Sequence, residues 1–291
     1  MNSSGVGIIL WAGYNAVKGK EEKVCRHFAE MGVKGFKVDF LDRDDAEMVD
    51  FQYKLAETAA KYKLMLDFHG CTKPTGLQRT YPNVLNFEGV LGLENAKFVR
   101  KHNTYSQVEY DMQIPYLRMV AGQMDYTQGA MRNATRGNYH PVYNEPMSQG
   151  TRCRQLAEYV VFDSPLNMLC DSPSNYMREQ ECLEYIAQIP TVWDETKGLC
   201  GEVGKYIVMA RRSGDVWYVG GMTGWNPKDL ELSLDFLPEG EYTVEIFVDG
   251  ANAHRIARDY RKVESALPAD RKVTLHMAPG GGFAAIIKPV K

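Results

Sequence analysis

A group of carboxylates, together with one histidine and one tryptophan, stands where predicted β-strands end. In chain order the group is Trp11, Asp39, Asp42, Asp67, His69, Glu88, Glu94, Asp125 and Asp171. In a barrel of parallel strands the carboxyl ends share one face, so we expect these side chains to meet there. Paired carboxylates can hydrolyse a glycosidic bond, because one protonates the leaving oxygen while the other attacks or activates water. Carboxylate clusters also bind hard cations such as Ca²⁺, so both chemistries are open.

Two members of the group have a structural interpretation beside the chemical one. Asp39 interrupts the apolar segment 36–40, where it serves equally well as a cap for the next helix or as a partner for Lys37. His69 ends a strand before a glycine-rich turn. A histidine in that position is either a substrate contact or a buried, hydrogen-bonded side chain.

A loop with two carboxylates follows the fourth predicted strand. Glu88 and Glu94 are separated by six positions that include Gly89 and Gly92. The glycines allow the loop to fold back, so that both carboxylates face one ion. The alternative is that Glu94 only begins a helix, where the dipole favours a negative charge.

Strand-like and helix-like segments alternate through the first two thirds of the chain, which predicts a parallel sheet of the (β/α) barrel type. The strand-like segments cover residues 7–13, 36–40, 63–68, 84–88, 117–122 and 166–170, and the helical ones 20–31, 44–62, 150–161 and 175–187. A barrel needs eight strands. The six found here predict a (β/α)8 TIM-type barrel that lacks its first strands, with a missing N-terminal segment or another chain completing it.

Short alternating strands separated by Gly, Asn and Pro turns begin near residue 200. This pattern predicts a small antiparallel β-sandwich domain. We place a partial barrel at 1–195 and the β-domain at 196–291.

Composition excludes several classes of protein. Thirty-four Lys+Arg against 37 Asp+Glu give a net charge of −3, which argues against a nucleic-acid partner. No apolar run reaches the ~20 residues of a membrane span. Six cysteines without close pairing do not suggest a zinc ribbon. The N-terminal residues show no signal-peptide pattern.

Longer motifs resemble glycoside hydrolase family 97. They lie at residues 32–45, 69–83, 86–89 with Glu94, 121–131, 148–152 and 190–195. The resemblance implies a calcium-dependent enzyme for α-glycosides, with an N-terminal β-sandwich, a (β/α)8 barrel and a C-terminal β-domain. It extends from about residue 6 to the C-terminus, and the sandwich and first barrel strands have no counterpart here.

The resemblance also assigns roles to residues. Inverting members of the family carry a Glu directly after the histidine matched by His69, where this chain has Gly70. Retaining members carry an Asp at the position of Asp39, which therefore resembles their nucleophile. Glu94 matches the general acid/base and a ligand close to the metal, and Glu88 matches a calcium ligand.

These assignments imply a retaining α-galactosidase that uses Ca²⁺ and acts on the ends of α-galactoside oligosaccharides. Contacts to substrate hydroxyls are expected from His69, Lys37 and Lys73, and Trp11 either stacks on the sugar or belongs to the barrel core. The alternatives are specificity for α-glucosides or β-L-arabinopyranosides at the same site, or a non-catalytic fragment that binds sugar. The family also implies a periplasmic or exported protein.

Overall fold

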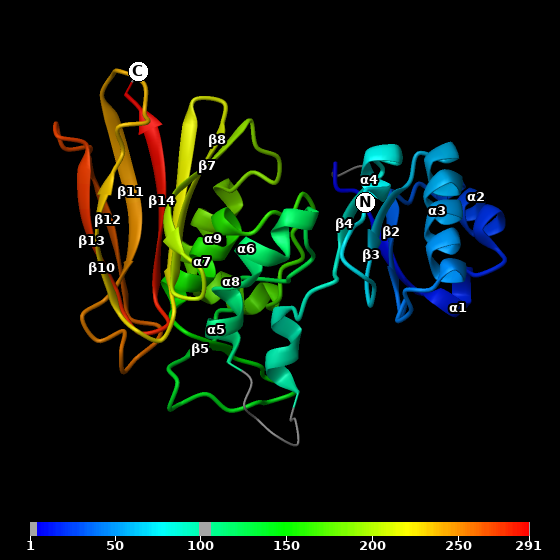
Figure 1. Cartoon of the computed structure of the whole chain (residues 1–291), viewed down its shortest axis with the longest axis horizontal. Coiled ribbons are helices and arrows are strands. Elements are labelled where there is room, and N and C mark those ends of the chain that lie inside the picture. The colour runs from blue at the N-terminus through cyan, green and yellow to red at the C-terminus, as the bar shows by residue number, and fades with distance from the viewer. Residues whose placement is uncertain (1–4, 99–105, 291) are drawn as a thin grey trace. The chain divides into compact units, whose positions relative to one another are not determined.

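The computed structural model describes residues 5–98 and 106–290, which form two compact units (Figure 1). The first unit comprises the chain up to Gly92 together with residues 118–126 and 164–167. The second comprises residues 93–117 and 127–163 and the chain from Met168 onward.

The first unit contains a sheet of four parallel strands in the order β1-β2-β3-β4, connected by helices. The strands are β1 (Ile9–Gly13), β2 (Gly35–Asp39), β3 (Met65–Phe68) and β4 (Val84–Phe87). The helices are α1 (Tyr14–Val17), α2 (Glu21–Glu30), α3 (Ala46–Lys61), α4 (Leu77–Thr80) and the 3₁₀ turn η3 (Met119–Ala121). Four parallel strands with helical crossovers are the repeating pattern of a (β/α) barrel, here with an open sheet.

Helix α3 shows how the sequence pattern produces the first unit. Asp45 caps the helix, because its carboxylate accepts the Met48 N–H at 3.1 Å. The predicted stripe of Met48, Phe51, Leu55 and Ala59 is buried against the core. Val38 and Phe68 of the strands are fully buried in the same core, so helix α3 packs against the sheet.

Two of the six predicted barrel strands are absent. Residues 117–122 form the end of a helix and the turn η3, and Leu117 and Val120 are 66% and 82% exposed instead of buried as a central strand requires. Residues 166–170 are irregular. Pro165 has no N–H for a ladder, and the Leu166 carbonyl accepts the Asn86 side chain at 3.1 Å instead of a strand neighbour.

The second unit contains the remaining helices and all the antiparallel strands. Its helices are η2 (Leu93–Lys97), α5 (Gln107–Asp111), α6 (Ile114–Leu117), α7 (Arg152–Val161), α8 (Pro173–Arg178) and α9 (Gln180–Gln188). Its strands are β5 (Asn133–Ala134), β6 (Ser148–Gln149), β7 (Glu195–Glu202), β8 (Tyr206–Ser213), β9 (Val216–Thr223), β10 (Lys228–Ser233), β11 (Tyr242–Asp249), β12 (Tyr260–Ala266), β13 (Lys272–Met277) and β14 (Gly282–Pro289). The single helix predicted over 175–187 is two helices, α8 and α9, because the backbone of Glu179 is not helical.

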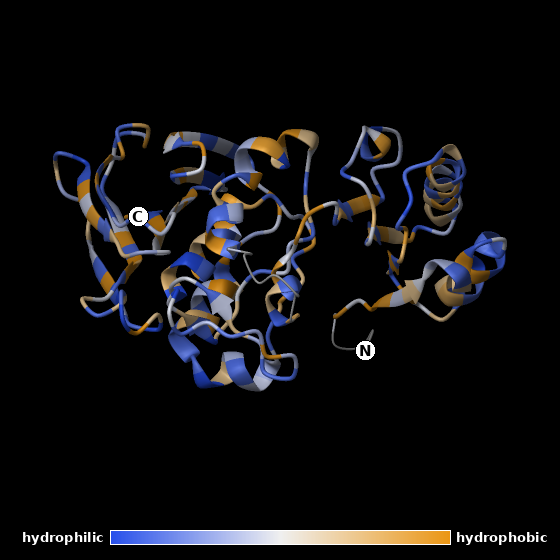
Figure 2. Cartoon of the chain, turned by 60° about the horizontal axis from the view of Figure 1, so that its bottom comes forward, coloured by the Kyte–Doolittle hydropathy of each residue, from blue (hydrophilic) through white to orange (hydrophobic). Residues whose placement is uncertain are grey.

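Two antiparallel sheets form a sandwich in this unit. A six-stranded sheet has the order β12-β11-β14-β9-β8-β7, and β10 pairs with β13. Leu232 and Leu275 of the small sheet share one core with Trp217 and Phe283 of the large one. In the first half of β11 buried positions alternate with exposed or partly exposed ones. Hydrophobic (orange) and hydrophilic (blue) residues likewise interchange along the chain in Figure 2.

Helix α7 covers the other face of the large sheet, and every residue of the helix is buried. Glycines in the strands allow this close approach. A Cβ on Gly220 would lie 2.8 Å from the Ala157 carbonyl oxygen, and one on Gly282 would lie 2.9 Å from the Arg154 Cα. The helix therefore packs with the β-strands, and the boundary predicted at 195/196 stays a prediction. Among the described residues, no helix has the length and apolar character needed to span a membrane.

A fully buried arginine connects α7 to two other parts of the second unit. The Arg154 guanidinium forms an ion pair with Asp111 of α5 at 3.1 Å and donates to the Thr223 carbonyl at 2.8 Å. It also donates to the Val108 carbonyl at 3.1 Å. Both charged side chains are fully buried. Removal of one therefore leaves the charge of the other away from water and without this partner.

We expect Arg154→Met to lower the free energy of unfolding by about 3–5 kcal/mol, because it removes the buried positive charge that pairs with Asp111. Urea unfolding followed by circular dichroism measures this loss. Lys205→Met is the control, since the Lys205–Glu202 pair is exposed and such pairs contribute about 0–1 kcal/mol. Equal losses in the two variants would show that the buried pair has no special role.

Candidate active site

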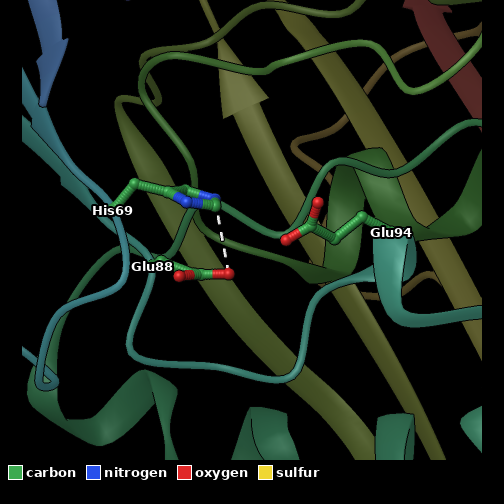
Figure 3. A group of neighbouring side chains, drawn as sticks. All are labelled: His69, Glu88 and Glu94. Carbon is green, nitrogen blue, oxygen red and sulfur yellow. Dashed lines mark ion pairs between the residues drawn. The ribbon is translucent and has the colours of Figure 1, made fainter. Parts of the chain in front are cut away.

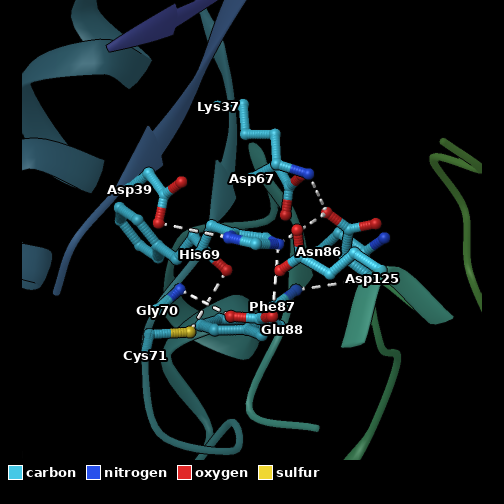
Figure 4. Close-up of polar contacts among 12 residues, drawn as sticks. Lys37, Asp39, Asp67, His69, Gly70, Cys71, Asn86, Phe87, Glu88 and Asp125 are labelled. Carbon is cyan, nitrogen blue, oxygen red and sulfur yellow. Dashed lines mark hydrogen bonds and ion pairs between the residues drawn. The ribbon is translucent and has the colours of Figure 1, made fainter. Parts of the chain in front are cut away.

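The polar side chains of the first unit gather at the carboxyl ends of its parallel strands (Figure 4). Lys37 is in register with Trp11 on one neighbouring strand and with Asp67 on the other. Asp39 is the last residue of β2, His69 directly follows β3, and Glu88 directly follows β4. Five members of the predicted group, Trp11, Asp39, Asp67, His69 and Glu88, therefore lie together at these strand ends, with Lys37 among them.

Asp39 is held by three hydrogen-bond donors. The Trp11 indole N–H donates to Oδ2 at 3.0 Å, and the Phe40 backbone N–H donates to Oδ1 at 2.6 Å. The His69 Nδ1 lies 3.1 Å from Oδ1. Burial opposes the charge, but these donors outweigh it and lower the pKa of Asp39. The site therefore keeps this carboxylate ionised and oriented.

His69 lies between two carboxylates. Its Nδ1 faces Asp39, and its Nε2 lies 3.3 Å from Glu88 Oε1, the ion pair drawn in Figure 3. The other Glu88 oxygen accepts the Gly70 backbone N–H at 2.7 Å. An imidazole with acceptors at both nitrogens fixes the positions of both carboxylates relative to each other.

A second group of charges lies deeper in the strand ends. The Lys37 ammonium is 2.5 Å from Asp125 Oδ2 and 3.8 Å from Asp67 Oδ2. Burial and the neighbouring Asp125 raise the pKa of Asp67 to about 9. At neutral pH Asp67 therefore keeps its proton, and the Lys37 ammonium pairs with Asp125. Burial opposes the Lys37 charge, but the two aspartates raise its pKa.

Arg118 is a part of the site that the sequence reasoning missed. Its guanidinium donates to five backbone carbonyls, those of Phe87, Glu88, Gly89, Gly122 and Gln123, at 2.9–3.2 Å. It thereby joins the end of β4 to the segment that carries Asp125. No pattern near Arg118 indicates this role, because all five acceptors belong to the backbone.

A hollow of about 450 Å³ opens beside these residues. Its lining is Leu41, Asp42, Arg43, Asp44, Gly70, Cys71, Thr72, Glu88, Gly89 and Val90. Glu88 therefore faces both His69 and an oxygen-rich cavity. Burial raises the pKa of the Cys71 thiol to about 12, so the only sulfur on the wall is neutral.

Gly70 leaves its position open for the carboxylate of Asp39. Its φ is +56°, a left-handed conformation that disfavours side chains. A Cβ there would lie 2.8 Å from Asp42 Oδ1 and 3.2 Å from Asp39 Oδ1. A side chain at residue 70 would therefore force the Asp42 carboxylate to move and would crowd the carboxylate of Asp39.

Three further predicted site residues are Lys73, Asp171 and Glu94. Lys73 is exposed, and its backbone packs against Gly89. Asp171 belongs to the second unit, where it accepts the Met131 N–H at 2.9 Å. Glu94 lies on η2 of the second unit, with Lys97 4.0 Å away. Glu94 stands six positions after Glu88 in the chain, which limits the distance between their Cα atoms to about 20 Å.

Comparison with curated proteins finds relatives over nearly the whole chain. A "Retaining alpha-galactosidase" from Bacteroides thetaiotaomicron is 63% identical over 286 residues, which are 98% of this chain and 43% of that protein. A "Probable retaining alpha-galactosidase" from Streptomyces bingchenggensis is 30% identical over 97% of this chain and 41% of its own length. The chain thus spans less than half the length of these relatives.

Solved structures share the fold. A glycoside hydrolase family 97 enzyme from Pseudoalteromonas sp. strain K8, in complex with panose, matches with a TM-score of 0.89 and 28% identity over 100% of this chain and 48% of its own. A β-arabinopyranosidase matches with a TM-score of 0.84 and 28% identity over 98% of this chain and 46% of its own. These matches confirm the predicted fold class, an open (β/α) barrel segment followed by an antiparallel β-domain.

Two sequence models of one family match the two end regions of the chain. The model described as glycoside hydrolase 97 matches residues 1–90, which carry Asp39, His69 and Glu88. The model described as glycosyl-hydrolase 97 C-terminal, oligomerisation, matches residues 192–288, which form the antiparallel sandwich. Together with the relatives, they show that the chain belongs to glycoside hydrolase family 97.

Proposed function

We propose that this chain carries the catalytic site of a retaining α-galactosidase. The observation that carries the proposal is the pair Asp39 and Gly70. A carboxylate held by three donors stands at the end of β2, and the nearby position 70 has a left-handed backbone and carries no side chain. The 63% identity to a protein named a retaining α-galactosidase supports the same conclusion.

Asp39 has the properties of a glycosidase nucleophile. A nucleophilic carboxylate must be ionised and fixed in orientation, and the donors around Asp39 favour both. In the first step one oxygen of Asp39 attacks the anomeric carbon as the glycosidic C–O bond breaks. Glu94 delivers its proton to the departing oxygen, so the products are a free alcohol and a galactosyl ester of Asp39.

The second step returns the enzyme to its starting state. The Glu94 carboxylate takes a proton from water, the water oxygen attacks the anomeric carbon, and the ester bond to Asp39 breaks. Two inversions give net retention, for which the two carboxyl groups should be about 5–5.5 Å apart. His69 keeps Asp39 oriented through both steps because its other nitrogen is held by Glu88.

We propose Ca²⁺ as the cofactor, with Glu88 and Glu94 among its ligands. Ca²⁺ binds six to eight oxygens, and the hollow next to Glu88 offers carboxylates of Asp42 and Asp44 and a neutral thiol that does not compete. The donor chemistry therefore fits a hard cation. When bound, the ion supplies positive charge that orients sugar hydroxyls, and Glu88 is held in place for it by the Gly70 N–H and His69.

A second specificity has support from one comparison. A β-L-arabinopyranoside has the ring stereochemistry of an α-galactoside without the exocyclic CH₂OH, and the similar solved structure is a β-arabinopyranosidase. Glucoside specificity and a non-catalytic, sugar-binding role are further alternatives. In the proposed role the substrate is an α-galactoside oligosaccharide, and the working protein is exported and includes a segment that completes the barrel.

Asp39→Ala should reduce hydrolysis of 4-nitrophenyl α-D-galactopyranoside by at least about a thousandfold, because no covalent intermediate forms. Added azide should restore turnover of the variant and yield β-galactosyl azide, identified by mass spectrometry and NMR. Asp50→Ala is the matched control, since Asp50 is exposed on α3 and does not line the hollow. Activity of Asp39→Ala near that of the unmodified chain would contradict the assignment.

Glu88→Gln should raise the dissociation constant for Ca²⁺ by at least about tenfold, because one charged ligand is lost. Isothermal titration calorimetry after removal of metal with EGTA measures the change without any need for turnover. Glu47→Gln, at an exposed position on α3, serves as the control. If both variants bind Ca²⁺ like the unmodified chain, Glu88 is not a ligand.

The raised pKa of Asp67 predicts a pH dependence of stability. The folded chain holds a proton on Asp67 up to about pH 9, whereas the unfolded chain loses it near pH 4. Stability from this group is thus full below pH 4 and is lost as pH rises toward 9. Asp67→Asn should make the slope of unfolding free energy against pH less negative by up to about 1.4 kcal/mol per pH unit between pH 5 and 8.

Urea unfolding at several pH values tests this change of slope. Asp50→Asn, at an exposed position on α3, should leave the slope unchanged. Equal slopes for Asp67→Asn and the unmodified chain would mean that Asp67 is ionised in the folded state.

A further inference from the structure

Phe40 combines two features that do not favour the folded state. Its φ is +65°, a left-handed conformation that is unfavourable for a residue with a bulky side chain. Its side chain is 60% exposed, so the fold gains little from burying the ring. Among the described residues, the other non-glycine residues with positive φ are Lys63, Thr127 and Arg271, all of which are polar. Strain of this kind often marks a functional position.

Phe40 forms a corner with Trp11, which is 57% exposed. The two ring centroids are 5.6 Å apart and the angle between the ring planes is 86°, so the rings are nearly perpendicular. Gly13 lies beside both rings: a Cβ there would lie 3.4 Å from Phe40 Cδ2 and 3.7 Å from Trp11 Cη2. Without a side chain at residue 13, the aromatic surfaces lie close to the backbone of β1.

The carboxylate of Asp39 is hydrogen-bonded to both aromatic residues. Trp11 donates its indole N–H to one oxygen, and the Phe40 backbone N–H donates to the other. The left-handed backbone at residue 40 therefore does two things at once. It points the N–H at Asp39, and it leaves the Phe40 ring exposed next to Trp11.

A galactosyl ring has the chemistry that such a corner binds. Its axial 4-hydroxyl leaves the C–H groups of carbons 3, 4 and 5 together on the opposite face, and aromatic rings pack well on such apolar faces. We propose that Trp11 and Phe40 form an aromatic platform for the sugar unit that Asp39 attacks, in which the Phe40 ring packs on the apolar face of the sugar and the perpendicular Trp11 ring borders its edge. This inference rests on the proposed function and adds Phe40 as a specificity-determining residue.

Calorimetric titration with D-galactose and thermal unfolding test the platform on the whole chain. In Phe40→Asn the backbone N–H is kept, the left-handed conformation is well tolerated and the ring is lost. We expect its galactose dissociation constant to rise by about tenfold, with an unchanged or higher Tm. Phe40→Tyr keeps the ring and should bind galactose within about threefold of the unmodified chain.

Lys63→Asn is the matched control, because Lys63 also has a left-handed backbone (φ +56°) and is exposed before β3 begins, at the other end of the strand from His69. It should leave galactose affinity unchanged. The platform is wrong if Phe40→Asn binds galactose like the unmodified chain, if its Tm falls clearly below that of Phe40→Tyr, or if the unmodified chain binds no galactose.

These outcomes differ from a failure of the proposed function. Hydrolysis that depends on Asp39, combined with unchanged galactose binding by Phe40→Asn, overturns the platform alone. Galactose binding that depends on Phe40, combined with hydrolysis that does not depend on Asp39, supports the platform and overturns the nucleophile.

Discussion

The site depends on one physical constraint, the close approach of several carboxylates at the ends of parallel strands. Asp39 and Glu88 lie on either side of His69, and Asp67 lies beside Asp125 in the deeper layer. Such charges repel one another unless each has a compensating partner. His69 contacts both carboxylates of the outer pair, and in the inner pair Lys37 lies beside both aspartates while Asp67 keeps its proton. Because each layer is compensated separately, Asp39 can stay ionised close to a carboxyl group that stays neutral.

The backbone is organised to hold this arrangement. Arg118 joins the carbonyls after β4 to the segment that brings in Asp125, and the Gly70 N–H holds Glu88. Gly70 and Phe40 both have a left-handed backbone. A side chain at residue 70 would crowd Asp42 and Asp39, and the ring of Phe40 is exposed beside Trp11. In the second unit Arg154 has a comparable role in the interior, since it ties α7 to α5 and to the end of β9.

The sequence predicted the parts of this account that depend on periodicity and local order. The strand ends at Asp39, His69 and Glu88 follow from apolar runs, and the stripe on α3 follows from helical spacing. It did not predict contacts made by residues distant in the chain, such as Lys37 with Asp125 or Arg118 with five carbonyls. The apolar segments 117–122 and 166–170 were wrongly predicted to be strands. Apolar composition alone does not provide a neighbouring strand with which a segment can pair. The catalytic, metal-binding and substrate-binding roles of the predicted site residues all stay predictions.

The central claim is that Asp39 acts as a nucleophile, so that the reaction proceeds with retention. The most direct measurement follows the anomeric proton of released galactose by NMR during the first minutes of hydrolysis of 4-nitrophenyl α-D-galactopyranoside with Ca²⁺. The account predicts that α-galactose appears first and then mutarotates toward the equilibrium mixture. Initial release of β-galactose would contradict it, because a single displacement by water would then have taken place.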